Sequence, residues 1–167
     1  RTKDKQMMTN TLKTTLSKPR TAKKNQSLSK EEQVKATKRI AELELRLWGV
    51  LFGEPRTVSP LVDQLNSKLR ALDDRELISQ VRPLTVNMKK RAETAKKNRK
   101  NGPAYDRAVS ALADRLWALD KDRLLVNCVR NEAIRIGTRR RANGDTTKSF
   151  HTRKVEKADR DVDRVRH

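Results

Sequence analysis

The chain has 167 residues, of which 37% are charged and only 34% are hydrophobic, so a large enclosed core is not expected. Its 41 Lys and Arg face 21 Asp and Glu, and the resulting formal charge of +20 indicates a polyanionic partner. The single cysteine, Cys128, excludes an internal disulfide framework, and the spacing of Cys and His does not suit a zinc finger. No apolar stretch approaches ~20 residues, and the first residues lack the apolar segment of a secretory signal. We therefore expect a cytoplasmic protein without membrane insertion, associated with the nucleoid or part of a nucleoprotein particle.

Residues 1–27 predict a basic arm that is disordered on its own. Eight Lys and Arg stand against one Asp in this segment, and Thr, Ser and Asn fill most of the remaining positions. The apolar side chains between them are too few to offset the entropy of ordering. We therefore expect the folded part of the chain to begin after residue 27.

A helix is predicted from residue 30 to residue 52. Ser29 and Glu32 have the spacing of a capping box, in which each side chain accepts a hydrogen bond from the other residue's backbone N–H. Apolar residues then recur at steps of three and four as far as Leu51, and Gly53 followed by Pro55 ends the pattern. Both ends of this helix are thus marked in the sequence.

Two further helix starts follow. The pair Ser59-Pro60 predicts a second helix whose leucines line one face as far as Leu72. The segment Asp73–Glu76 predicts a third start, and Pro83 is expected to interrupt the helix that follows it. The helical pattern then resumes until Asn101-Gly102-Pro103, which predicts a turn.

The most hydrophobic part of the chain predicts two more helical stretches. One apolar stripe covers residues 105–119, and another runs from residue 124 to a stop at Gly137. Strict alternation of apolar and polar residues is absent, so strands are a poor alternative. The sequence therefore predicts an all-α fold, with a helical domain at residues 28–137.

The end of the chain is predicted to be a basic loop and a charged helix. The loop covers residues 138–152 and includes an Asn143-Gly144 turn. The helix covers residues 153–167, where Val155, Ala158, Val162 and Val165 form a thin apolar seam that needs another element to pack on.

The residues that could act in catalysis or metal binding are better explained by structural roles. Cys128 lies on an apolar helical stripe and is interpreted as a small core residue, with a reactive thiol as the minor alternative. Neither His151 nor His167 falls into a pattern that pairs it with this cysteine. Asp73, Asp74 and Glu76 are explained as helix-start residues rather than as a metal cluster. We therefore predict that the protein is not an enzyme, with no catalytic residue, no metal and no cofactor.

Two tryptophans lie within or beside apolar stripes. Trp48 and Trp117 are interpreted as core anchors. The alternative is stacking on a nucleic-acid base, which requires cationic neighbours on an exposed face.

Clustered cations predict contacts with the phosphates of a nucleic acid. Seven Lys and Arg stand against one Glu between residues 89 and 100, and an arginine triplet lies in the basic loop. The predicted nucleic-acid-binding residues are Lys23, Lys24, Lys89, Lys90, Arg91, Lys96, Lys97, Arg99, Lys100, Arg139, Arg140, Arg141, Lys148, Arg153 and Lys154. Lysines at such positions orient a protein on the backbone, whereas the arginine triplet is better suited to bidentate contacts with bases.

The stretch from Leu28 to Glu42, LSKEEQVKATKRIAE, resembles the L-T-x-E-x-E-x-x-x-A-K-R-I-E stretch in the N-terminal conserved region of bacterial sigma-70 family factors. Residues 47–52 and 59–61 look like the passage into that family's variable spacer, and residues 153–160 are similar to the charged helix that leads into its core-binding region. The resemblance implies binding to DNA beside the core of RNA polymerase. Two features depart from the family: Leu43 stands where Gly is usual, and a basic arm replaces the aromatic-containing segment that contacts promoter DNA.

Two non-catalytic functions fit these features. The first is a sigma-like transcription initiation factor that binds DNA and RNA polymerase. The second is a structural component of a ribosome, nucleoid or virion that binds RNA or DNA phosphates without sequence specificity. Neither requires a membrane or a small-molecule substrate.

Overall fold

The computed structural model describes residues 28–166, so the predicted basic arm lies outside the described part of the chain. The chain divides into two units, residues 1–37 and residues 38–167. In the first unit the capping box is present: the Ser29 N–H donates to Glu32 Oε2 at 2.9 Å, and the Glu32 N–H donates to Ser29 Oγ at 3.3 Å. The predicted start of the first helix is therefore confirmed.

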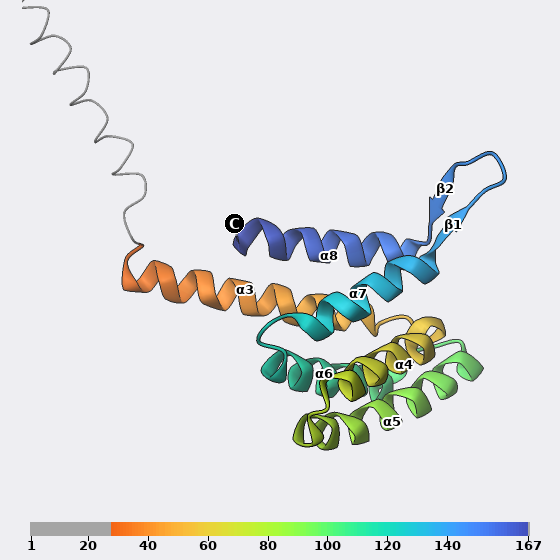
Figure 1. The fold of residues 1–167 in the computed structure, drawn as a ribbon, viewed down its shortest axis with the longest axis horizontal. Coiled ribbons are helices and arrows are strands. Elements are labelled where there is room, and N and C mark those ends of the chain that lie inside the picture. The colour runs from red at the N-terminus through yellow and green to blue at the C-terminus, as the bar shows by residue number, and fades with distance from the viewer. Residues whose placement is uncertain (1–27, 167) are drawn as a thin grey trace, which may run out of the picture. The chain divides into compact units, whose positions relative to one another are not determined.

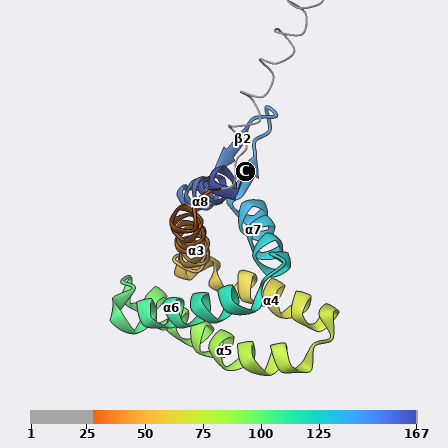
Figure 2. The same cartoon turned by 90° about the vertical axis from the view of Figure 1, so that its left-hand side faces the viewer.

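The described residues form six helices and one small antiparallel hairpin, which confirms the predicted all-α fold. In chain order the elements are α3 (Lys30–Leu51), α4 (Pro55–Leu72), α5 (Arg75–Asn98), α6 (Gly102–Leu119), α7 (Leu124–Gly137), β1 (Thr138–Arg140), β2 (Thr146–Lys148) and α8 (Phe150–Arg166). In the second unit α5 packs against both α4 and α6, and α7 packs against α4 and α8. The helix α8 also lies beside the later part of α3 (Figures 1 and 2).

One apolar cluster joins all of these helices in the second unit. Each helix contributes at least one side chain with 0% exposure: Leu47 of α3, Leu65 of α4, Met88 of α5, Leu112 of α6, Val129 of α7 and Val155 of α8. The thin apolar seam predicted near the end of the chain therefore does find a partner, because Val155 and Val162 are buried in this cluster.

The two tryptophans have different environments. Trp48 is 2% exposed, so its predicted role as a core anchor is confirmed. The same prediction is wrong for Trp117, which is 39% exposed and donates from its indole Nε1 to Glu44 at 2.9 Å. Cys128 is partly buried, and its sulfur accepts a hydrogen bond from Gln64 at 3.5 Å.

Two prolines lie inside helices that they were expected to begin or interrupt. The second helix begins at Pro55 instead of Pro60, because the Glu54 side chain accepts from the Arg56 N–H and caps it five residues earlier. Pro83 lies within the continuous helix α5. The carbonyl that each proline leaves without a helical donor belongs to an exposed residue, Arg56 or Ser79.

The predicted basic loop at residues 138–152 is instead a hairpin followed by the first turn of α8. Thr138 pairs with Lys148, and Arg140 pairs with Thr146. The prediction failed because these short strands have no apolar face, so the alternation that indicates a strand is missing. The helix α8 begins at Phe150, three residues before the predicted residue 153, because the Ser149 hydroxyl accepts from the Thr152 N–H and caps it there.

The end of α7 lies in close contact with the start of α8. A Cβ atom added to Gly137 would collide with the hydroxyl groups of Thr152 and Ser149. Thr152 is fully buried, and its hydroxyl donates to the Ala133 carbonyl at 3.4 Å. Glycine at position 137 therefore allows the two helices to meet here.

We expect Gly137→Ala to lower the free energy of unfolding by about 1–3 kcal/mol, because the new methyl group forces the hydroxyls of Thr152 and Ser149 apart. Gly49→Ala is the matched control, since its Cβ meets nothing within 4 Å. This control should raise the stability by up to about 1 kcal/mol through helix propensity. Urea unfolding of both variants measures the two effects, and an unchanged midpoint for Gly137→Ala would contradict the close contact.

Candidate nucleic-acid interface

A groove of about 760 Å³ lies where the end of α5, the start of α4, the base of the hairpin and the start of α8 meet. Five cationic residues from three separate segments line it. Lys96, Arg99 and Lys100 come from the end of α5, Arg56 comes from the first turn of α4, and Arg139 comes from β1. Within residues 28–166, Lys96 alone among the five has a carboxylate partner, Glu93 at 2.6 Å. We call this surface the basic groove.

The end of α5 places its cations in this groove through a specific backbone turn. Arg99 adopts a left-handed conformation with φ of 53°, and the N–H of Lys100 donates to the Ala95 carbonyl at 3.3 Å. The Asn101 side chain then donates to the Gly53 carbonyl at 3.4 Å, which holds this turn beside the connection between α3 and α4. Cations are also favourable at this position because the C-terminal end of a helix has negative polarity.

Only part of the cationic run predicted between residues 89 and 100 reaches the basic groove. The members that line it are Lys96, Arg99 and Lys100. Lys89 instead pairs with Asp63 of α4 at 2.5 Å. Arg91 lines a separate hollow of about 340 Å³ beside the start of α6. Lys90 and Lys97 line neither surface.

The arginine triplet lies on the hairpin. Arg139 lines the basic groove, and strand alternation places Arg140 on the opposite face of the hairpin. Arg141 begins the turn between the strands. All three are exposed, and none is within ion-pair distance of a carboxylate among residues 28–166.

The remaining predicted residues do not line the basic groove. Lys148 pairs with Glu156 at 2.7 Å, and Arg153 is exposed on the first turn of α8. Lys23 and Lys24 lie outside the described residues. Lys154 contacts an aromatic ring that was not among the predicted site residues.

That ring belongs to Phe150, the first residue of α8. Phe150 is 73% exposed, and the Lys154 Nζ atom lies 4.6 Å from its ring centre. It lines the basic groove and also a neighbouring hollow of about 430 Å³ that includes Arg46. Phe150 could have been identified as a site residue, because it is a lone aromatic residue in a basic segment. Nothing in the sequence indicated that Arg56 belongs to the site.

His151 also lines the groove, and the sequence assigned it no role in binding. Its Nε2 atom is buried and has no hydrogen-bond partner among residues 28–166. Burial lowers the pKa of this imidazole, although the nearby carboxylate of Glu54 acts in the opposite direction. His151 is therefore neutral at neutral pH and adds no charge to the groove.

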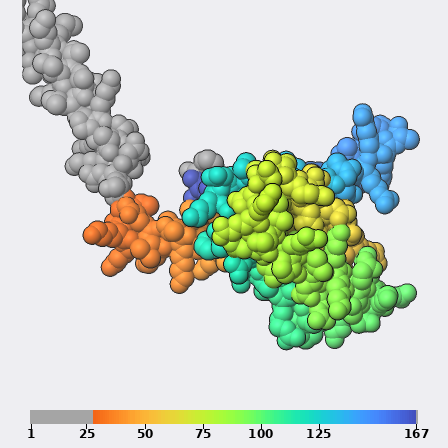
Figure 3. Space-filling model, turned by 60° about the horizontal axis from the view of Figure 1, so that its bottom comes forward, coloured from red at the N-terminus to blue at the C-terminus, as the bar shows by residue number. Residues whose placement is uncertain are grey.

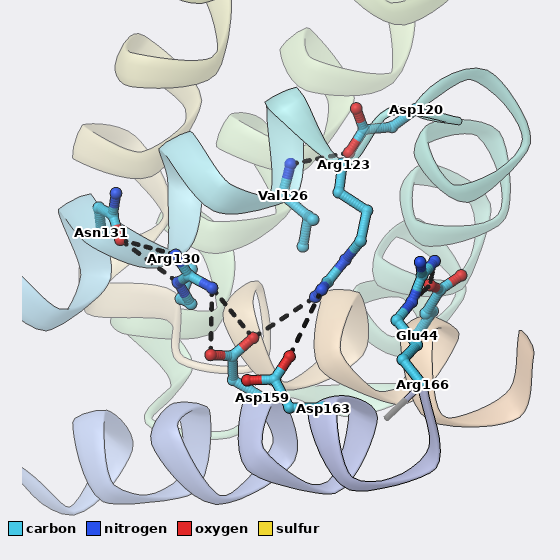
Figure 4. Close-up of polar contacts among 9 residues, drawn as sticks. All are labelled: Glu44, Asp120, Arg123, Val126, Arg130, Asn131, Asp159, Asp163 and Arg166. Carbon is cyan, nitrogen blue, oxygen red and sulfur yellow. Dashed lines mark hydrogen bonds and ion pairs between the residues drawn. The ribbon is translucent and has the colours of Figure 1, made fainter. Parts of the chain in front are cut away.

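Two arginines outside the groove, Arg123 and Arg130, pair with carboxylates of α8. Arg130 of α7 contacts both oxygens of Asp159 at 3.1 and 3.2 Å, and Arg123 lies 3.5 Å from Asp159 and 3.7 Å from Asp163. Figure 4 shows both aspartates of α8 directed toward these arginines. The cluster holds α8 against α7. Its guanidinium charges are balanced by carboxylates, whereas the arginines of the hairpin have no carboxylate partner among residues 28–166.

Within the described residues, no group of three or more His, Cys, Asp or Glu side chains is placed to hold a metal ion. No helix between residues 28 and 166 is long and apolar enough to cross a membrane. Comparison with protein-family models, with curated proteins and with solved structures finds no match to this chain. Function must therefore be inferred from the chain's own geometry.

We expect the folded state to lose stability as the pH falls below 6.5, the ordinary histidine pKa, because the unfolded chain then takes up a proton that buried His151 resists. Neutral His151 is therefore compatible with the folded state above that pH, and the free energy of unfolding falls as the pH is lowered. Urea unfolding at a series of pH values below 6.5 should show a smaller loss of the free energy of unfolding for His151→Gln than for the wild type. His167→Gln removes the chain's other histidine, and a larger effect in that variant would contradict the assignment.

Proposed function

We propose that this protein is a non-catalytic nucleic-acid-binding protein whose basic groove holds a sugar–phosphate backbone. The observation behind this proposal is the convergence of five cations from α4, the end of α5 and β1 on one surface whose lining includes a single carboxylate, that of Glu54. Like charges repel, so gathering them in one place costs free energy unless an anion lies between them. Charge needed for solubility alone would be better spread over the whole surface.

The exposed ring of Phe150 supports nucleic acid over other polyanions. A large aromatic side chain that is 73% exposed gains little from packing. Sites for nucleic acids combine a cationic groove with aromatic side chains on which bases stack. Phe150 lies at the edge of the basic groove, with the ammonium of Lys154 beside it.

Within this class, we propose a sigma-like transcription initiation factor that binds DNA and the core of RNA polymerase. The support is the similarity of residues 28–42 to the N-terminal conserved region of sigma-70 factors, together with the basic groove in the segment that corresponds to the spacer. Promoter-specific contacts are not part of the proposal, because a basic arm precedes the motif where the family has the segment that makes them.

The second candidate is a structural nucleoprotein component that binds DNA or RNA phosphates without reading sequence. It is favoured by the lysines of the groove, which suit phosphates better than base edges. The two candidates differ in their protein partner. A purified bacterial RNA polymerase core retained by the immobilised chain supports the first, and co-sedimentation with ribosomal particles or condensed DNA without polymerase binding supports the second.

Neutralising the groove by Lys96→Gln, Arg99→Gln and Lys100→Gln should weaken binding to any duplex sequence. The slope of log K against log salt should fall by about 0.9 for each phosphate that the variant no longer neutralises. Fluorescence anisotropy of a labelled duplex over a series of salt concentrations measures both quantities.

The matched control removes the same charge elsewhere, by Arg70→Gln, Arg75→Gln and Arg82→Gln. These side chains are exposed, lie toward the other end of the α4–α5 pair, and line no part of the basic groove. The control should retain most of the salt slope. Equal losses of affinity in the two variants would show that net charge, rather than the groove, determines binding.

A further inference from the structure

The hairpin between α7 and α8 has a tip of defined geometry. The Gly144 N–H donates to the Arg141 carbonyl at 3.0 Å, and the Arg141 N–H donates to the Asp145 carbonyl at 2.7 Å. Gly144 has a φ of 89°, as the left-handed position of a three-residue hairpin loop requires. The Asn143 side chain also accepts from the Asp145 N–H at 3.1 Å. These bonds hold the tip in one conformation.

Hydrogen bonds also attach the base of the hairpin to the end of α7. The Ser149 N–H donates to the Gly137 carbonyl at 2.8 Å, and the Thr138 hydroxyl donates to the Ile134 carbonyl at 2.7 Å. From this base the two strands stand out from the helices, as Figures 1 and 2 show and as the blue atoms of Figure 3 show on the surface. The hairpin is therefore an anchored projection.

Packing in the core does not explain this projection. Its strands, TRR and TTK, contain no apolar residue, and only Thr138 and Thr147 are partly buried. Two short strands without an apolar face gain little stability by themselves. The hairpin does, however, present three exposed arginines in fixed relative positions: Arg139 on one face, Arg140 on the other, and Arg141 at the turn.

We propose that this hairpin enters the major groove of B-form DNA. Arg139 and Arg140 contact the phosphate backbones on opposite sides, and Arg141 reaches the base edges. The proposal rests on the nucleic-acid-binding function proposed above and deepens it by naming duplex DNA as the ligand. Arginine suits this role because its planar fork matches both phosphate oxygens and the O6 and N7 atoms of guanine.

The dimensions of the hairpin favour this ligand. Two strands lie about 4.8 Å apart, and their three residues extend about 10 Å. The major groove of B-form DNA is about 12 Å wide and about 8.5 Å deep, and it admits a two-stranded ribbon. The minor groove is about 6 Å wide, so a ribbon with side chains on both faces would enter it only if the duplex were deformed. The major groove of duplex RNA is deep and narrow, so side chains cannot read it.

The test compares two GC-rich DNA duplexes of one sequence, one unmodified and one whose cytosines carry glucosylated 5-hydroxymethyl groups that fill the major groove. Anisotropy should show that glucosylation weakens wild-type binding by about tenfold or more. The variant Arg139→Gln, Arg140→Gln, Arg141→Gln should bind the unmodified duplex more weakly and lose this difference. Because the three side chains are exposed, its circular dichroism and urea unfolding should match the wild type.

The variant Arg70→Gln, Arg75→Gln, Arg82→Gln removes the same charge and should keep the full difference between the duplexes. Equal wild-type affinity for both duplexes, or a persistent difference in the hairpin variant, would overturn the hairpin proposal while leaving the nucleic-acid-binding function intact. If the wild type bound neither DNA nor RNA at low salt, the proposed function itself would fail. Duplex RNA of the same sequence should be bound no better than glucosylated DNA.

Discussion

The contact between α7 and α8 at Gly137 is the packing constraint on which the basic groove and the hairpin both depend. The hydroxyls of Thr152 and Ser149 occupy the space that a side chain at position 137 would fill. The Ser149 hydroxyl also accepts from the Thr152 N–H at 3.1 Å, so the same residues begin α8 and close the junction. The two helix ends touch, and the segment between them leaves the surface and returns as a hairpin (Figure 1).

The distribution of carboxylates determines which cations remain available for a ligand. At the contacts of α8 with α7 and α3, three arginines pair with acids: Arg123 and Arg130 with Asp159, and Arg166 with Glu44. Removing an acid from such a partly buried pair leaves an unpaired charge, which is costly. With about half as many acids as cations in the chain, this arrangement leaves most cations of the basic groove and the hairpin uncompensated among the described residues.

Helix ends could be predicted where a local hydrogen bond determines them. Ser29 caps α3, and Asp74 caps α5 by accepting from the Leu77 N–H at 3.1 Å, as the sequence pattern indicated. Predictions that depended on tertiary context failed. Pro83 does not break α5 because buried Val81 and Thr85 hold the helix on both sides of it. Since long-range packing compensates for the missing hydrogen bond, a rule based on local sequence could not anticipate it.

The sequence predicted that the candidate site is cationic, but it could not show which cations meet in the groove. The composition indicated clustered cations, yet the spacing along α5 could not show that Lys89 pairs with Asp63 while Arg99 turns into the groove. Arg56 is a single arginine between Pro55 and Thr57, so only the fold brings it to the site. Contacts between distant segments therefore define the groove.

Arg139 connects the two proposed surfaces, because it lines the basic groove and also forms one face of the hairpin. A phosphate backbone lying in the groove would pass this side chain, so one wall of the adjoining major groove would lie against the same face of the hairpin. Arg140, on the opposite face, would then be directed toward the other wall. On this proposal a single duplex occupies both surfaces, and a ligand without a second strand would leave Arg140 without a phosphate partner. Because only a duplex would give Arg140 a phosphate partner, the proposed binding in the groove and at the hairpin together predicts a preference for duplex DNA.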